Sequence, residues 1–212
     1  MTATVLIWFR HDLRLADHAA LHAALHHAGR VLPVFVLDDA AAGPHRLGGA
    51  SRWWLRGSLA SLSADLAARG APLLLAKGHA ETVVPALAAA LGAREVHAGR
   101  GMEPWAREQS RRVHEALSAD GRALHLHTTV VLREPHGFAS GSGSPYAVYT
   151  PFAKAMLAAG EPGAPLPAPD AIPGAELPAG GESLEDLGLY PVPGEPDCAP
   201  KAAAQSGSPG TG

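Results

Sequence analysis

The chain has 212 residues, of which 47% are hydrophobic and 17% charged, and its formal net charge is −3. At roughly 150 residues per domain, this length allows one domain with an appendage or at most two small domains. The sequence holds no apolar run long enough to span a membrane and only one cysteine, Cys198, which excludes an internal disulfide. With no signal-peptide pattern at Met1–Thr4, we expect a cytoplasmic protein. The near-neutral charge argues against a broadly basic nucleic-acid-binding surface.

Short apolar runs alternate with helix-period segments through the first two thirds of the chain. Asp17 is the predicted cap of the first helix, and Trp54, Leu55, Leu59, Leu62 and Leu66 form the predicted apolar stripe of the second. The pattern predicts strands at 5–9, 31–37, 73–75, 94–98 and 123–127, with helices at about 17–29, 51–69, 82–91 and 104–120 between them. Such consecutive βαβ units indicate an α/β protein: a doubly wound, Rossmann-like sheet of five parallel strands with helices on both faces.

The composition changes sharply near residue 160. Residues 160–212 hold 11 of the 19 prolines and 10 of the 24 glycines. Because proline removes backbone donors and glycine loses much entropy on ordering, we expect the globular unit to end there. The predicted organisation is an α/β domain over 1–135, an irregular Pro/Gly-rich connector over 136–190 with a short helix near 150–159, and a low-complexity, disordered tail over 191–212.

Ligands of parallel α/β sheets bind at the carboxyl ends of the strands, which here are followed by the segments 10–14, 38–52, 78–80 and 99–105. The first of these contains neither the GxGxxG fingerprint of dinucleotide-binding proteins nor a P-loop. It carries Arg10, Asp12 and Arg14 instead. These charges are typical either of a surface cluster whose Arg–Asp pairs fix the loop or of a ligand site.

The stretch from Trp8 to Leu21, WFRHDLRLADHAAL, resembles the opening of the DNA photolyase/cryptochrome family, W-[FH]-R-x-D-L-R-L-x-D-N-x-A-L. His18 stands where the family commonly has Asn. The resemblance continues in the same order through several further segments and covers roughly Thr4 to Leu189. These segments are Val31–Asp38, Ser51–Leu55, Gly70–Leu75, Glu103-Pro104 and Gly141–Phe152.

This resemblance implies an α/β domain that holds an antenna chromophore, followed by a connector to a helical FAD-binding domain. In the family, reduced FAD repairs pyrimidine dimers in light-driven fashion, and the antenna is a methenyl folate, an 8-hydroxy-deazaflavin or a flavin such as FMN. The FAD-domain motifs W-R-E-F-Y and A-N-N-x-x-W-Q-W do not occur in these residues. We therefore expect a chain truncated before its FAD domain and inactive alone. Its partner would be that helical domain, with damaged DNA bound only through it and no membrane.

Three alternatives remain open. The chain could be a stand-alone nucleotide-, flavin- or folate-binding module without enzymatic activity, a fragment of a cryptochrome photoreceptor, or a fragment that retains the fold but binds nothing.

The resemblance also suggests which residues hold the chromophore. Glu103 matches the family position that grips a folate pterin, with Met102 beside it, and His45 lies in the loop where folate-binding members have a contacting histidine. Gly101 stands where deazaflavin-binding members carry Asp, so methenyl folate is favoured over 8-hydroxy-deazaflavin or FMN. We add the first-loop residues Arg10, Asp12 and Arg14 to these candidates.

Two further patterns, of histidines and of tryptophans, do not indicate a functional site. His18, His22 and His26 have the i, i+4, i+8 spacing of a helical metal site, with His27 beside them, but no thiol or carboxylate is positioned nearby in sequence. A solvated helix face is the preferred interpretation, and no metal site is expected. Trp53 and Trp54 open a helix, where one can face the core and the other the rim, and we favour core packing over a functional role for them.

Overall fold

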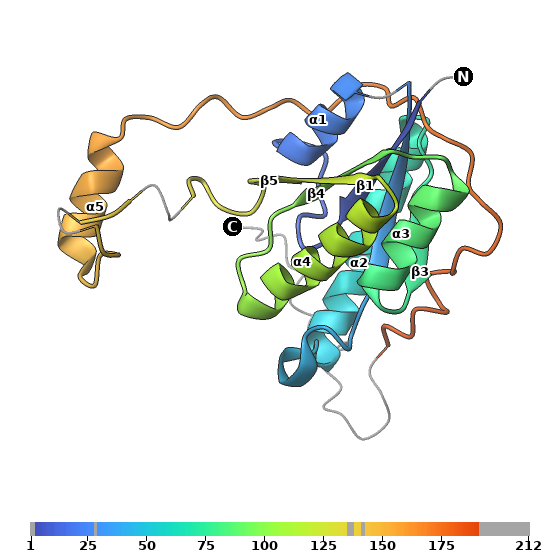
Figure 1. Cartoon of the computed structure of the whole chain (residues 1–212), viewed down its shortest axis with the longest axis horizontal. Helices are drawn as coiled ribbons and strands as arrows, with labels where there is room; N and C mark the ends of the chain where they lie inside the picture. Colours follow the sequence, from blue (N-terminus) through green and yellow to red (C-terminus); the bar gives the residue numbers. More distant parts are fainter. Residues whose placement is uncertain (1–2, 28, 135–137, 141–142, 191–212) are drawn as a thin grey trace, which may run out of the picture.

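A computed structural model of the chain describes residues 3–27, 29–134, 138–140 and 143–190. Five strands form one sheet in the order β3-β2-β1-β4-β5, and every neighbouring pair is parallel (Figure 1). The strands are β1 (Thr4–Phe9), β2 (Arg30–Leu37), β3 (Leu74–Lys77), β4 (Glu95–Gly99) and β5 (Ala123–His127). The predicted α/β fold is confirmed, and all five strands lie within about two residues of their expected positions.

Helices cover both faces of the sheet, because the central strands are apolar on both sides. On β1, Ile7 and Phe9 face α1 and α2, whereas Leu6 and Trp8 face α3 and α4. The four helices are α1 (Ala19–His27), α2 (Gly49–Ala68), α3 (Ala80–Ala90) and α4 (Pro104–Ala119). A short 3-10 helix, η1 (Gly43–His45), precedes α2.

The first helix begins one residue later than its predicted cap implies. Asp17 has a positive φ of 51°, and α1 starts at Ala19. The cap is His18, whose Nδ1 accepts a hydrogen bond from the Leu21 backbone N–H at 3.1 Å. The assignment of the cap to Asp17 was therefore wrong.

The Pro/Gly-rich segment after residue 160 does not leave the globular unit, contrary to the sequence argument. Ile172, Leu187 and Leu189 are buried in the same core cluster as α1 and α2. The Ala175 N–H donates to the Val31 carbonyl, and the Glu182 N–H donates to the Leu75 carbonyl on the outer strand β3. Irregular backbone thus covers a sheet edge that would otherwise present unpaired groups.

The short helix expected near 150–159 is present as α5 (Tyr149–Ala158). It stands apart from the sheet in Figure 1, and Tyr149 and Leu157 are about four-fifths exposed. The predicted tail over 191–212 and part of the Gly141–Ser144 loop lie outside the described residues. None of the helices in the described part of the chain is both long and apolar enough to cross a membrane.

Candidate ligand site at the carboxyl edge of the sheet

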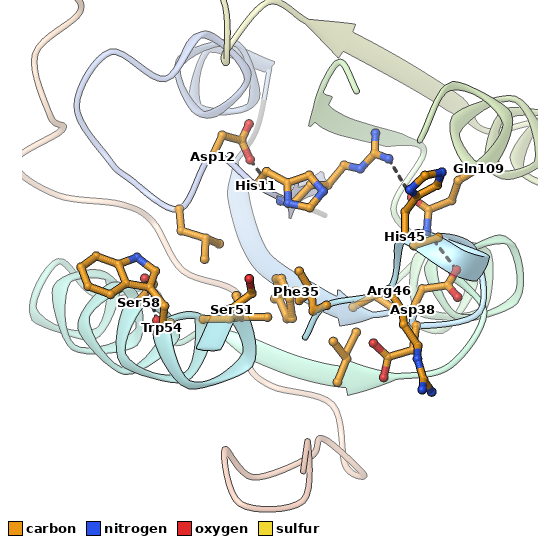
Figure 2. Close-up of a pocket in the computed structure, with 18 of the residues that line it drawn as sticks. His11, Asp12, Phe35, Asp38, His45, Arg46, Ser51, Trp54, Ser58 and Gln109 are labelled. Carbon is orange, nitrogen blue, oxygen red and sulfur yellow. Dashed lines mark hydrogen bonds between the residues drawn. The ribbon is translucent and has the colours of Figure 1, made fainter. Parts of the chain in front are cut away.

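A cavity of about 660 Å³ opens at the carboxyl ends of β1 and β2 (Figure 2). Trp8 and Phe35 come from these strands, and α2 forms one wall with Ser51, Trp54 and Ser58. On the other side in Figure 2 lie His45, Arg46 and Asp38, with Gln109 above them, and His11 and Asp12 lie above the α2 wall. The volume falls in the range of about 300–1,000 Å³ that is usual for small-molecule and cofactor sites. A cavity therefore lies at the edge where the sequence predicts ligand binding, and the binding itself stays a prediction.

Trp54 is the most exposed aromatic side chain of this cavity, at 70% exposure. The prediction that it packs in the core was wrong, because only Leu55, Leu59, Leu62 and Leu66 of the expected stripe contact the core cluster. Spacings of four, three and four residues place these leucines on one face of α2. Trp54 lies one residue off that stripe and shares its face with Ser58, which explains its exposure.

Arg10 fixes the loop after β1 to helix α4. Its guanidinium donates to Gln109 Oε1 at 2.7 Å, to Ser110 Oγ at 3.0 Å and to the Ala106 carbonyl at 3.2 Å. The side chain is only 8% exposed and lies over the Trp8 ring. Burial lowers the pKa of Arg10, and the nearby carboxylate of Asp12 acts against that shift. Arg10 is thus a buried anchor of the cavity wall and not part of a surface cluster.

Asp12 and His18 form a buried pair beneath the same loop. His18 Nε2 and Asp12 Oδ2 lie 3.2 Å apart, and both side chains are almost fully buried. Because His18 Nδ1 accepts the Leu21 N–H, the ring proton is on Nε2, the nitrogen that faces Asp12. Asp12 Oδ1 accepts the Arg10 backbone N–H at 3.0 Å. The prediction of a solvated His18 was therefore wrong: the side chain links the first loop to the start of α1.

The Asp12 carboxylate predicts an acid-sensitive fold. Burial would raise its pKa, but the hydrogen bonds from His18 and the Arg10 N–H outweigh burial and hold it well below the usual range. In the unfolded chain an Asp titrates near about 3.9, so the unfolded state takes up the proton first as pH falls. The stabilisation from Asp12 is therefore complete above about pH 5 and is lost progressively as the pH falls from about 4 through the much lower pKa of the folded state.

Urea unfolding from pH 7 down to about pH 2 measures this effect, with a loss of about 1.4 kcal/mol expected for each pH unit below about pH 4 until the folded-state pKa is reached. Asp12→Asn is expected to flatten the acid limb of the stability curve. An acid limb of unchanged slope in that variant would contradict the assignment.

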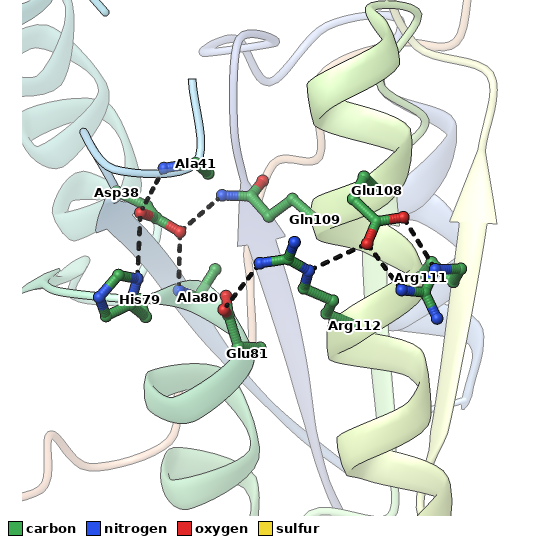
Figure 3. Close-up of polar contacts among 9 residues, drawn as sticks. All are labelled: Asp38, Ala41, His79, Ala80, Glu81, Glu108, Gln109, Arg111 and Arg112. Atoms are coloured by element: carbon green, nitrogen blue, oxygen red, sulfur yellow. Dashed lines mark hydrogen bonds and ion pairs between the residues drawn. The ribbon is translucent and has the colours of Figure 1, made fainter. Parts of the chain in front are cut away.

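Asp38 closes the other side of the cavity and ties three elements together (Figure 3). Its oxygens accept the backbone N–H groups of Ala41 and Ala80 at 3.1 and 2.9 Å and the side-chain amide of Gln109 at 2.9 Å. Gln109 in turn accepts from Arg10, so one chain of hydrogen bonds runs from β1 through α4 to β2 and α3. This network holds the cavity wall in place before any ligand binds.

The residues predicted as chromophore contacts divide between two hollows. Arg10, Asp12, Arg14 and His45 line the large cavity. Arg14 donates to the backbone carbonyls of Ala16, Asp17 and Thr129, so it also braces its own loop. Glu103 and Met102 line a separate hollow of about 90 Å³, which shares Arg10, His11 and Asp12 with the large cavity. Glu103 and His45 are thus not brought into one cavity.

Two glycines allow the close packing behind this site. A Cβ atom on Gly99 would lie 2.1 Å from Asp12 Oδ2, and a Cβ atom on Gly101 would lie 2.5 Å from the Cβ of Ala106. Gly101 also approaches the Arg10 guanidinium. The backbone as folded leaves no room for any side chain at position 101.

Sequence reasoning missed several residues of the large cavity, although it named the right loops. Arg46 and Ser51 lie within the segment 38–52 that follows β2, and Trp54 and Ser58 follow on the polar face of α2. The exposure of Trp54 could have been predicted from the polar residue one helical turn later, Ser58. No local pattern indicates Gln109, because its side chain joins Arg10 and Asp38, which come from distant segments of the chain.

A five-stranded parallel sheet with a cavity at its carboxyl edge places this domain in the class of doubly wound α/β proteins, whose ligands bind at that edge. Comparison with known proteins narrows this class. Residues 5–170 match the family model described as DNA photolyase, and the chain belongs to that family.

Relatives and solved structures agree with this assignment. The chain is 39% identical over 198 residues to a deoxyribodipyrimidine photo-lyase of Agrobacterium fabrum, covering 93% of this chain and 40% of the relative. It is similar to the crystal structure of a bacterial class III photolyase from Agrobacterium tumefaciens, with 36% identity and a TM-score of 0.87 over 96% of this chain and 41% of that one. An archaeal photolyase from Sulfolobus tokodaii shares the fold, with 18% identity and a TM-score of 0.76 over 97% of this chain and 46% of that one. The chain therefore spans about two fifths of the length of the two Agrobacterium proteins.

Proposed function

We propose that this chain is the antenna domain of a DNA photolyase and binds a planar light-harvesting chromophore in the large cavity. The observation that carries this proposal is the cavity of about 660 Å³ at the carboxyl edge of the sheet, with an exposed tryptophan on its wall. The Sulfolobus tokodaii photolyase, which has the same fold, was solved with two FAD molecules, and a novel light-harvesting cofactor was inferred for it.

The chemistry of the wall suits an aromatic ring with an anionic tail. Trp54 presents an open ring face, and Leu13 and Leu55 add apolar surface. An aromatic ligand stacked there gains more than its buried area alone provides. Arg46 is exposed on the opposite side, where its guanidinium can pair with a carboxylate or phosphate. A methenyl folate carries a glutamate tail and FMN a phosphate, so both fit this description.

Methenyl folate remains the first choice among the chromophores. FMN could use the same ring and tail contacts, so the preference rests on His45, which lies on the same wall as Arg46 in the loop where the resemblance puts the contacting histidine of folate-binding members. The packing around Gly101 leaves no position there for the Asp of deazaflavin-binding members. The hollow at Glu103 is too small for a ring by itself, so a contact from Glu103 would be made with the ligand's edge.

Calorimetric titration of the untagged chain with methenyltetrahydrofolate and with FMN tests this proposal. Trp54→Ala is expected to weaken binding of the preferred ligand about tenfold, because loss of a stacking contact costs about 1–1.5 kcal/mol. Tyr149→Ala on α5 is the matched control: it removes an aromatic side chain of similar exposure far from the cavity and should leave affinity unchanged.

Glu103→Gln distinguishes the two hollows in the same titration. If Glu103 holds the pterin edge, this variant weakens folate binding but not FMN binding, while the fold stays intact. Equal affinity of Glu103→Gln and the parent chain for folate would remove Glu103 from the site. Equal affinity of Trp54→Ala and the parent chain for both ligands would overturn the assignment to the large cavity.

We further propose that light-driven repair of pyrimidine dimers is the activity of this domain joined to a helical FAD-binding domain. In that arrangement, the chromophore absorbs light here and passes the energy to FAD. Damaged DNA would be bound through the helical domain, which agrees with the small net charge of −3 on this chain.

A further inference from the structure

A second group of polar side chains lies away from the cavity, where the end of α1 meets β4 and β5. Glu95 and His97 are on β4, His125 is paired with His97 across the sheet on β5, and His27 is the last residue of α1. Residues i and i+2 of a strand share a face, so Glu95 and His97 point the same way, and the cross-strand pair adds His125 to that face. Three imidazoles therefore surround one carboxylate.

Three imidazole nitrogens approach one oxygen of Glu95 at similar distances, so Glu95 is not simply half of one salt bridge. His97 Nε2, His27 Nδ1 and His125 Nε2 lie 3.4, 3.7 and 3.9 Å from the same oxygen, Glu95 Oε2. One ligand atom each from Glu95, His97 and His125 lies within 4.8 Å of the others. In a tetrahedral zinc site with bonds of about 2.0–2.1 Å, ligand atoms lie about 3.3 Å apart. The side chains need to move only slightly to close around such an ion.

His97 is already held as a metal-bound histidine usually is. Its Nδ1 contacts His127 Nε2 at 3.0 Å, which leaves Nε2 directed at Glu95. Protein ligands of zinc commonly have their second ring nitrogen fixed by such a partner. The His97 side chain is 3% exposed, so its position is fixed by the surrounding packing.

In a second cluster of similar composition among the described residues, the carboxylate oxygens are already bound by other groups of the protein. Asp38, His79 and Glu81 also lie close together. However, Asp38 accepts three hydrogen bonds from Ala41, Ala80 and Gln109, and Glu81 pairs with Arg112 at 3.6 Å (Figure 3). A cation there would have to displace both an arginine and the network that supports the cavity.

We propose that Glu95, His97 and His125, with His27 from α1, bind a divalent transition-metal ion, for which Zn²⁺ is the best match. Imidazole and carboxylate ligands suit zinc, and about half of the His27 and His125 side chains is open to solvent, so the ion can enter the folded protein. The bound ion would join the end of α1 to β4 and to the edge strand β5. The i, i+4 histidines of α1 that the sequence singled out do not form this site: His18 is buried against Asp12 and His22 contacts the Pro167 carbonyl.

Titration of the untagged, chelator-treated chain with ZnCl₂ in a calorimeter tests this site. We expect one Zn²⁺ per chain and a rise in melting temperature with added Zn²⁺. His125→Ala and Glu95→Gln are each expected to weaken Zn²⁺ binding at least tenfold and to abolish the rise. Both replaced side chains are partly exposed, so the variants should fold, and circular dichroism without metal checks this.

His79→Ala is the matched control, because it removes an exposed histidine from the other cluster. Its Zn²⁺ affinity should equal that of the parent chain. Absence of Zn²⁺ binding to the parent chain would overturn the proposal. Parent-like affinity in both His125→Ala and Glu95→Gln, or a loss confined to His79→Ala, would overturn it as well.

Discussion

Replacing Arg10 by alanine is expected to lower the free energy of unfolding by about 3–5 kcal/mol, which is a large part of the stability of a domain of this size. The guanidinium is 8% exposed and donates to Gln109, Ser110 and the Ala106 carbonyl of α4. Its removal leaves buried acceptors without donors and a hole beneath α4. The same change should weaken chromophore binding, because Gln109 then loses the contact that directs it at Asp38.

Urea unfolding followed by circular dichroism measures this loss. Arg107→Ala, on the exposed side of α4, is the matched control and should change the free energy of unfolding by less than about 0.5 kcal/mol. Arg10→Lys keeps the charge but not the planar set of five donors, so it is expected to recover only part of the loss. An Arg10→Ala chain as stable as Arg107→Ala would show that the buried network contributes little.

His18→Ala is expected to lower the free energy of unfolding by about 2–4 kcal/mol. The variant loses a helix cap, and it leaves the Asp12 carboxylate buried without the neighbouring imidazole. His18→Asn should retain most of the stability. An asparagine offers an oxygen to accept the Leu21 N–H and an amide N–H that can face Asp12. His18 has the same two contacts, the hydrogen bond from Leu21 and the 3.2 Å approach to Asp12. This equivalence gives a physical reason why a histidine can stand where related sequences commonly have asparagine.

His22→Ala on the same helix is the control for His18, since its ring is bound only to the Pro167 carbonyl at the surface. Thermal unfolding of the three variants separates the roles. If His18→Asn lost as much stability as His18→Ala, the explanation that asparagine replaces both contacts of His18 would be wrong.

The strands and helices were predictable because each carries a local signal. Val31–Leu37 is a continuous apolar run, and the leucines of α2 have helical spacing. The polar face of α2 could also have been read from sequence, since Trp54 and Ser58 are one turn apart. The predicted apolar stripe wrongly includes Trp54, which lines the cavity instead of packing in the core.

Other features depend on contacts between distant segments and had no local signal. The burial of His18 follows from the position of Asp12, and the metal cluster forms only when β5 pairs with β4 in the register that sets His125 beside His97. The composition after residue 160 correctly predicted irregular backbone but not its packing. Gly174 shows why: a Cβ there would lie 2.2 Å from the Gly70 carbonyl, so the glycine is what lets the segment approach the domain.

A crystal structure of the chain grown with methenyltetrahydrofolate or FMN tests the central claim most directly. The account predicts electron density for the ring in the large cavity, stacked on Trp54, with the anionic tail toward Arg46. Ring density elsewhere on the domain, or an empty cavity in crystals grown with either ligand, would contradict it.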